Sequence, residues 1–183
     1  VQRVKKACEN GRQAYWVCTL IEESDVFEAE AAEAIAKELR LVLPKLSIGL
    51  IHGRLKAGEK ISIMEQFKSK KIHLLVATTV IEVGVDVSNA SLMIIENSER
   101  LGLSQLHQLR GRVGRGSDQS YCVLLYNSNL SHKSKERLKI MRETSDGFEL
   151  AERDLEMRGP GEILGARQTG DIQFRVANLM RDA

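Results

Sequence analysis

Two hydrophobic patterns alternate along the first 127 residues of the chain. Short runs rich in apolar and β-branched residues predict buried strands. Between them, apolar residues recur at helical spacing, as Ala32, Ile35, Ala36 and Leu39 do among charged neighbours. This alternation predicts an α/β fold in which a mostly parallel sheet carries helices on both faces. The predicted strands are 15–20, 46–52, 72–77, 91–96 and 120–126, and the predicted helices are 2–10, 27–41, 59–68 and 101–113.

The pattern changes after Asn127, because only helical periodicity continues beyond it. Two further helices are predicted, over residues 133–145 and 148–157. Gly159-Pro160-Gly161 ends the second of them, since proline and glycine both disfavour a continuing helix. We therefore predict a sheet domain over residues 1–127, followed by a helical hairpin and a glycine-rich loop over residues 128–183.

Three arginines gather at the end of the helix predicted over 101–113. Arg110, Arg112 and Arg115 stand beside Gly111 and Gly114. A guanidinium group stays charged at physiological pH and meets phosphate oxygens with a planar fork of donors, so it can stabilise charge that develops in phosphoryl transfer. The alternative is a basic loop that touches a nucleic acid backbone or faces solvent. The arginines alone do not separate these two interpretations.

The segment 74–86 opens as a near-continuous apolar run, which is typical of a buried parallel strand. Thr78 and Thr79 follow at its carboxyl end, where open α/β sheets bind their ligands. Gly84 allows a close backbone approach, and Asp86 can accept hydrogen bonds from a sugar hydroxyl. An ordinary turn residue is the alternative for Asp86. The arginine cluster further along the chain favours the ligand-binding interpretation.

Together these two segments resemble motifs V and VI of the superfamily 2 helicases, whose motor consists of two RecA-like domains that close on ATP. The resemblance implies a RecA-like fold here. It also implies that Arg112 and Arg115 are the arginine fingers of the family pattern Gln-x-x-Gly-Arg-x-x-Arg, in which Gln108 is the leading glutamine.

The same resemblance assigns the strand-end segment. Thr78, with Thr79, is expected to contact the nucleic acid backbone, and Asp86, with Gly84, the nucleotide. Residues 51–60 resemble the motif IV region of the family. His52 lies within them, but a single histidine at a strand end is more often a packed residue than a ligand contact, so it is not among the expected site residues.

The C-terminal part narrows the resemblance. Residues 146–170 are similar to the translocation segment shared by the RecG family and the transcription-repair coupling factors, and residues 158–161 and 165–170 favour the RecG family. That likeness extends over essentially the whole chain, although Thr19 stands where the family has proline. It implies an ATP-dependent helicase that remodels branched DNA, such as stalled replication forks and Holliday junctions, in recombination and repair.

The likeness also implies a set of residues that couple ATP hydrolysis to movement along DNA. A solvated helix face is the alternative for Arg137, and a cation at a helix C-terminus the alternative for Arg158. The expected coupling residues are Arg137, Arg158, Arg167 and Gln168.

Composition agrees with an ordinary globular domain: 43% of residues are hydrophobic and 28% charged, with a net charge of +2. Such a small net charge does not announce a nucleic acid partner by itself. The odd number of cysteines, Cys8, Cys18 and Cys122, argues against a disulfide framework and suits reduced thiols in a cytoplasmic protein. No apolar run is long enough to span a bilayer.

No phosphate-binding Gly-x-x-x-x-Gly-Lys-Ser/Thr loop and no magnesium-holding Asp-Glu pair occurs in the sequence. We therefore expect an excised fragment that is inactive alone, with ATP and Mg²⁺ bound mainly by a first RecA-like domain and the DNA fork split by a separate wedge domain of the same polypeptide. A transcription-repair coupling factor, or a non-catalytic RecA-like binding module, remains the alternative. Flanking sequence would distinguish them.

Overall fold

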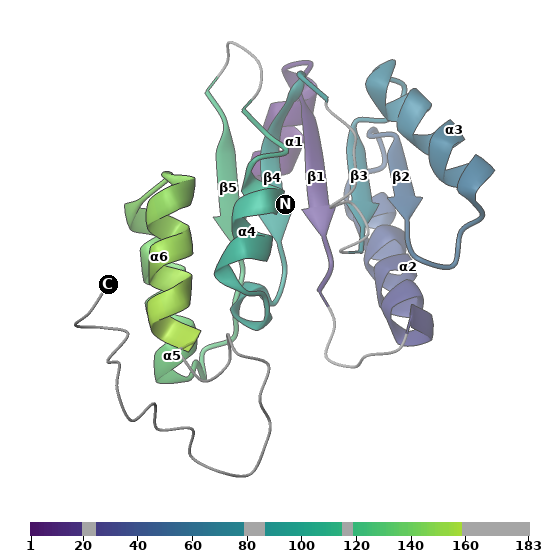
Figure 1. Ribbon diagram of the computed structural model, residues 1–183. Helices are drawn as coiled ribbons and strands as arrows, with labels where there is room; N and C mark the ends of the chain where they lie inside the picture. The colour runs from purple at the N-terminus through teal and green to yellow at the C-terminus, as the bar shows by residue number, and fades with distance from the viewer. Residues whose placement is uncertain (20–24, 79–86, 115–118, 159–183) are drawn as a thin grey trace, which may run out of the picture.

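The computed structural model describes residues 1–19, 25–78, 87–114 and 119–158. Within these ranges five strands form one sheet, and every neighbouring pair is parallel. The sheet confirms the predicted architecture (Figure 1). Its spatial order is β2-β3-β1-β4-β5, where the strands are β1 (Gln13–Val17), β2 (Ile48–Ile51), β3 (Leu74–Ala77), β4 (Ala90–Ile95) and β5 (Tyr121–Leu124).

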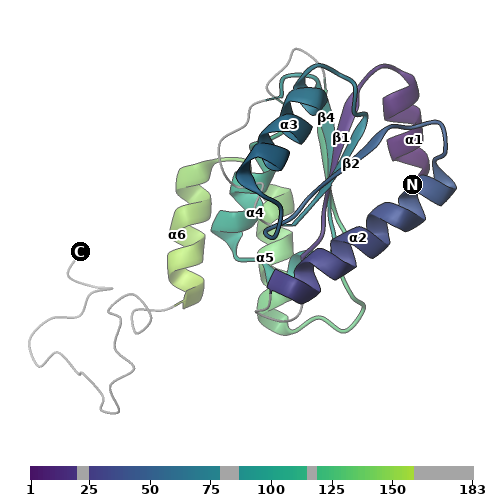
Figure 2. The ribbon, with the colours of Figure 1, turned by 90° about the vertical axis from the view of Figure 1, so that its right-hand side faces the viewer.

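Helices cover both faces of this sheet, as the sequence pattern predicts (Figure 2). The helices α1 (Gln2–Glu9) and α2 (Asp25–Val42) share an apolar cluster with one face. The helices α3 (Ala57–Lys68), α4 (Leu103–Arg110), α5 (His132–Glu143) and α6 (Gly147–Arg158) belong to the other face, and the short 3₁₀ helix η2 (Ser98–Arg100) precedes α4.

Cover on both faces explains why β1, β3 and β4 are buried at every position. Tyr15 of β1 packs edge-on against Phe67 of α3, with ring centroids 4.9 Å apart. The strand β5 differs, because it lies at the border of the sheet and Tyr121 is exposed. The predicted strand 120–126 is accordingly shorter in the structure.

A buried glutamine secures the start of β1. The Nε2 atom of Gln13 donates to the carbonyl oxygens of Phe67, at 2.6 Å, and Ile72, at 2.7 Å. Its Oε1 accepts from Asn89 Nδ2 at 3.2 Å. These bonds satisfy a polar side chain that is only 1% exposed, and they tie β1 to the ends of two crossover segments.

The hairpin formed by α5 and α6 packs on α4 and extends the same apolar cluster with Met141 and Leu150. Ser131 caps α5, since its Oγ accepts from the backbone N–H of Ser134 at 3.1 Å. At the other end of α5, the Arg110 guanidinium donates to the carbonyl oxygens of Met141, at 3.1 Å, and Thr144, at 2.8 Å. The division near Asn127 stays a prediction, and the hydrophobic core continues across it.

The helix α6 approaches α4 closely at Gly147. A side chain at Gly147 would bring a Cβ atom to 3.0 Å from His107 Nε2. The same histidine contacts Arg110, whose second terminal nitrogen lies 3.1 Å from His107 Nδ1. Arg110 is therefore a structural residue in this fold, unlike the arginines expected to act on phosphate.

No helix in the described part of the chain has the length and apolar character needed to cross a membrane. The three cysteines are free, and Cys8 and Cys18 are buried. The Cys8 thiol donates to the carbonyl oxygen of His73 at 3.6 Å. Burial raises the pKa of Cys8 from 9.0 to about 11.

This shift predicts an alkaline loss of stability. Between pH 9 and 11 the unfolded thiol loses its proton while the folded thiol of Cys8 keeps it, so the free energy of unfolding falls by up to about 1.4 kcal/mol per pH unit. The variant Cys8→Ala lacks this contribution. In urea unfolding, the difference in stability between the native chain and the variant should be largest near pH 8 and narrow by pH 10.5. A difference that stays constant with pH contradicts the buried-thiol account.

A second prediction concerns Arg110. The variant Arg110→Ala should lower the free energy of unfolding by about 1.5–3 kcal/mol, because it removes charge-assisted hydrogen bonds to carbonyls at the end of α5. Arg110→Lys should recover only part of this loss, since an ammonium group lacks the planar fork. The exposed Arg142 of α5 gives a matched control, and Arg142→Ala should change stability by no more than about 0.5 kcal/mol. Equal losses of stability for Arg110→Ala and Arg142→Ala in thermal unfolding would contradict the structural role of the Arg110 hydrogen bonds at the end of α5.

Candidate functional site

The parallel strands give the sheet two distinct borders, which we name the carboxyl edge and the amino edge after the strand ends that meet there. Thr78 lies at the carboxyl edge, one residue beyond β3, and its backbone N–H donates to Ile51 O at 3.1 Å. It is fully buried, and its Oγ1 has no hydrogen-bond partner among the described residues. A buried hydroxyl without a hydrogen-bond partner costs free energy.

The arginine cluster lies at the opposite border. Because α4 connects two parallel strands, it runs back toward their starts and ends at the amino edge. Two observations confirm this position. Gly114 lies close to Ser120, the residue before β5, because a Cβ atom at Gly114 would be 3.4 Å from the Ser120 side chain. Arg12, the residue before β1, donates to Gln119 O at 3.2 Å. Arg112 follows α4 here and is partly buried.

Gln108 lies on the exposed side of α4, four residues before Arg112 along the chain. The backbone N–H of Arg112 continues the end of the helix by donating to Leu109 O at 2.9 Å. Arg115 falls outside the described residues. The structure thus supplies the framework for one of the two expected arginine fingers and for the leading glutamine.

The sequence assigns the threonines to nucleic acid and the arginines to the nucleotide, and the structure separates Thr78 from Arg112 by the length of the strands. The link between the edges is the segment 79–86. It begins after Thr78 at the carboxyl edge and ends before Val87, whose carbonyl accepts from Ala90 at the start of β4. Thr79, Gly84 and Asp86 belong to this segment and lie outside the described residues.

The hairpin returns the chain to the carboxyl edge. Arg137 on α5 donates to Glu99 O at 3.0 Å and lies 3.3 Å from Ser134 Oγ, so it is a partly buried contact to η2 rather than a solvated side chain. The helix α6 runs antiparallel to α5 and ends at Arg158 (Figures 1 and 2). The side chain of Arg158, and the residues Arg167 and Gln168, lie outside the described part.

His52, which is not among the expected site residues, is buried beside another side chain. The Nε2 atom of His52 lies 3.5 Å from Glu33 Oε1 on α2. This contact agrees with packing at the end of β2.

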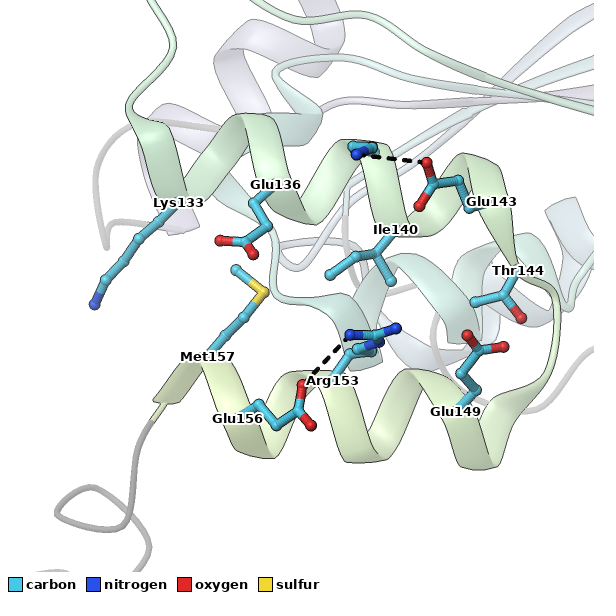
Figure 3. Close-up of a pocket in the computed structure, with 10 residues that line it drawn as sticks. Lys133, Glu136, Ile140, Glu143, Thr144, Glu149, Arg153, Glu156 and Met157 are labelled. Atoms are coloured by element: carbon cyan, nitrogen blue, oxygen red, sulfur yellow. Dashed lines mark ion pairs between the residues drawn. The ribbon is translucent and has the colours of Figure 1, made fainter.

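The outer face of the hairpin forms a hollow of about 480 Å³ between α5 and α6 (Figure 3). Ion pairs join Lys139 to Glu143 at 3.8 Å and Arg153 to Glu156 at 3.6 Å. Charges of both signs alternate around it, so it lacks the uniformly positive surface that a DNA backbone requires. The charged residues are Lys133, Lys139 and Arg153 against Glu136, Glu143, Glu149 and Glu156.

A carboxyl group at the carboxyl edge has a raised pKa. Glu96 directly follows β4, and burial raises the pKa of its carboxyl group above the usual range. No group of three metal-ligating side chains occurs within the described ranges.

The chain matches two protein families. Residues 1–117 match the helicase conserved C-terminal domain, and residues 144–183 match the C-terminal part of domain 3 of the ATP-dependent DNA helicase RecG. The first match covers the strands β1 to β4 and the arginine cluster, and it ends before β5. The second covers α6 and the segment that follows it.

Curated relatives of the chain are named ATP-dependent DNA helicase RecG. The chain is 67% identical to the ATP-dependent DNA helicase RecG of Pasteurella multocida and 64% identical to that of Escherichia coli K12, in each case over all 183 residues. It spans 26% of the length of each. A solved structure of RecG bound to a three-way DNA junction covers 88% of this chain at 42% identity, with a TM-score of 0.74, and the match takes up 21% of that chain. The chain therefore belongs to the helicase conserved C-terminal domain family, and its C-terminal part is of the RecG type.

Proposed function

We propose that this chain is the second motor domain of an ATP-dependent DNA helicase that remodels branched DNA, including stalled forks and Holliday junctions, in recombination and repair. The observation that carries the proposal is identity of 67% to a RecG helicase along the entire chain, from the sheet to the C-terminal end. Because the chain spans 26% of that relative, the activity belongs to a longer polypeptide. Its other parts are a first RecA-like domain and a wedge domain.

In this proposal the amino edge is the nucleotide side. Arg112 and Arg115 act as arginine fingers on ATP held by the first RecA-like domain, with Gln108 beside them. A guanidinium aimed at the transferred phosphoryl group stabilises charge that exists only in the transition state. Partial burial of Arg112 supports this role, because a charge acts more strongly where water is partly excluded. Gly84 and Asp86 are proposed to contact the nucleotide.

The nucleotide is ATP with Mg²⁺. The described part of this chain offers no cluster of metal ligands, so the ion and most phosphate contacts are assigned to the first RecA-like domain. In that arrangement this chain contributes guanidinium groups, and closure of the two domains brings them to the phosphates.

The carboxyl edge is the DNA side. Thr78, with Thr79, is proposed to donate to phosphate oxygens of duplex DNA, a role that suits the unpartnered Oγ1 of Thr78. The hairpin delivers the RecG-type segment to the same edge, because α6 ends there. Arg137, Arg158, Arg167 and Gln168 then couple domain closure to movement along the duplex.

The first test of this function is Arg112→Ala in the full-length protein. DNA-stimulated ATP hydrolysis should fall by about 10³ to 10⁵, the range measured for arginine fingers elsewhere. Binding to a branched DNA should stay close to that of the native protein, because a finger acts on the transition state. Hydrolysis and DNA binding are measured on the same preparations.

The controls are Arg112→Lys, which keeps the charge but loses the fork, and Arg142→Ala on the exposed side of α5. The lysine variant should remain strongly impaired and the Arg142 variant should hydrolyse normally. Equal loss of hydrolysis and DNA binding in Arg112→Ala indicates a DNA-contacting loop. Absence of hydrolysis in the native full-length protein indicates a non-catalytic binding module and overturns the proposal.

A second test separates coupling from chemistry. Arg158→Ala or Gln168→Ala in the full-length protein should leave most ATP hydrolysis in place while fewer base pairs are unwound per ATP consumed. If Arg158 only interacts with the helix dipole, its loss costs about 0.3–1 kcal/mol of stability and leaves unwinding per ATP unchanged. Thermal unfolding, hydrolysis and unwinding of the same variants decide between these roles.

A further inference from the structure

Polar side chains at the carboxyl edge form a connected path from β1 to α5, which we name the edge relay: Thr19, Asn97, Glu99, Asn127 and Arg137. The Thr19 hydroxyl donates to the carbonyl oxygens of Glu96 and, at 3.2 Å, of Asn97. In return the Asn97 Nδ2 donates to Thr19 O at 3.0 Å. The end of β1 is thereby joined to the corner that follows β4.

The relay continues from this corner to the hairpin. Asn127 Nδ2 donates to Glu99 Oε1 at 3.0 Å and lies 3.4 Å from Asn97 Oδ1. The backbone oxygen of Glu99 also accepts a hydrogen bond from the Arg137 guanidinium at 3.0 Å. The η2 corner is thus held from three directions: β1, the end of β5 and α5.

The backbone at Asn97 indicates that this corner is under constraint. Asn97 has φ 45° and ψ 41°, in the left-handed region. Asparagine tolerates this conformation better than most residues, but surrounding contacts still have to hold it. These contacts are the hydrogen bonds of the Asn97 side-chain amide, in which Nδ2 donates to Thr19 O and Oδ1 accepts from Asn127 Nδ2.

Two atoms of the relay are buried without a hydrogen-bond partner among the described residues, Arg137 Nε and Glu99 Oε2. They belong to the two side chains at the hairpin end. A displacement of α5 relative to η2 would change their surroundings together with the bonds that Arg137 and Ser134 donate to Glu99 O. The relay is therefore firmly bonded at its β1 end and less completely bonded at its α5 end.

We propose that Asn97 and Asn127 are positioning residues that transmit displacements between the end of β1 at Thr19 and Arg137 on the hairpin. The consequence for movement along DNA rests on the proposed function above. Thr19 supplies the hydroxyl that joins β1 to the corner, so the relay depends on this side chain.

The test uses the full-length protein and two pairs of variants. Asn127→Ala removes the donor to Glu99, and Asn129→Ala, an exposed asparagine in the same loop, is its matched control. Thr19→Val removes the hydroxyl with little change in side-chain shape, whereas Thr19→Ser retains the hydroxyl and serves as its control. Base pairs unwound per ATP should fall by about 2- to 30-fold in Asn127→Ala and Thr19→Val, the range for coupling residues that touch neither ligand. Asn129→Ala and Thr19→Ser should behave as the native protein.

A double-mutant cycle tests the connection itself. The effects of Asn127→Ala and Arg137→Ala on unwinding per ATP should be non-additive, because both interrupt one path. Additive effects, or equal losses of unwinding and hydrolysis that follow a lower melting temperature, overturn the proposal, since they indicate a merely structural role.

Hydrogen exchange separates failure of the relay from failure of the proposed function. Backbone amides in the first half of α5 should exchange faster in Asn127→Ala and Thr19→Val than in Asn129→Ala, whether or not the protein hydrolyses ATP. Unchanged exchange there overturns the relay. A native full-length protein without DNA-stimulated hydrolysis overturns the proposed function instead.

Discussion

The single direction of the described strands is the constraint on which the other features depend. In a parallel sheet each connection must return from the carboxyl edge to the amino edge before the next strand begins. The apolar clusters on both faces leave helices as the buried route for this return, so α4 delivers Arg112 to one edge while β3 delivers Thr78 to the other. The separation of Arg112 from Thr78 thus follows from strand direction.

The hairpin, like α4, extends between the two edges. It is fixed near the amino edge by Arg110, which binds carbonyl oxygens at the end of α5, and near the carboxyl edge by Arg137, which binds a carbonyl oxygen of η2. Both arginines act on backbone oxygens, so the attachment depends little on the identity of the partner side chains. Apolar packing by Met141 and Leu150 supplies the area between the two fixed ends. Both ends of α5 are therefore attached to the sheet domain by hydrogen bonds from arginine to backbone oxygens.

Periodicity predicts the order and type of these elements because burial on two faces imposes it directly on the sequence. Element ends depend on local capping: α4 spans Leu103–Arg110 within the predicted helix 101–113, since Gln105 Oε1 accepts from the Gly102 N–H at its start. The roles of neighbouring arginines are harder to predict. Arg110 and Arg112 are alike in sequence context, and only the tertiary position of α5 makes the first a structural residue. The edge relay has no local signal at all, because it joins residues as distant as Thr19 and Asn97.

The two edges also differ in how they can change. A strand of four or five residues spans roughly 13–17 Å, which exceeds the separation beyond which substitutions usually act independently on free energy. Replacements around Thr78 therefore leave the energetics around Arg112 largely untouched. Substitutions at one edge can therefore accumulate without altering the other, and the residues that join the two edges are where changes on both sides must stay compatible.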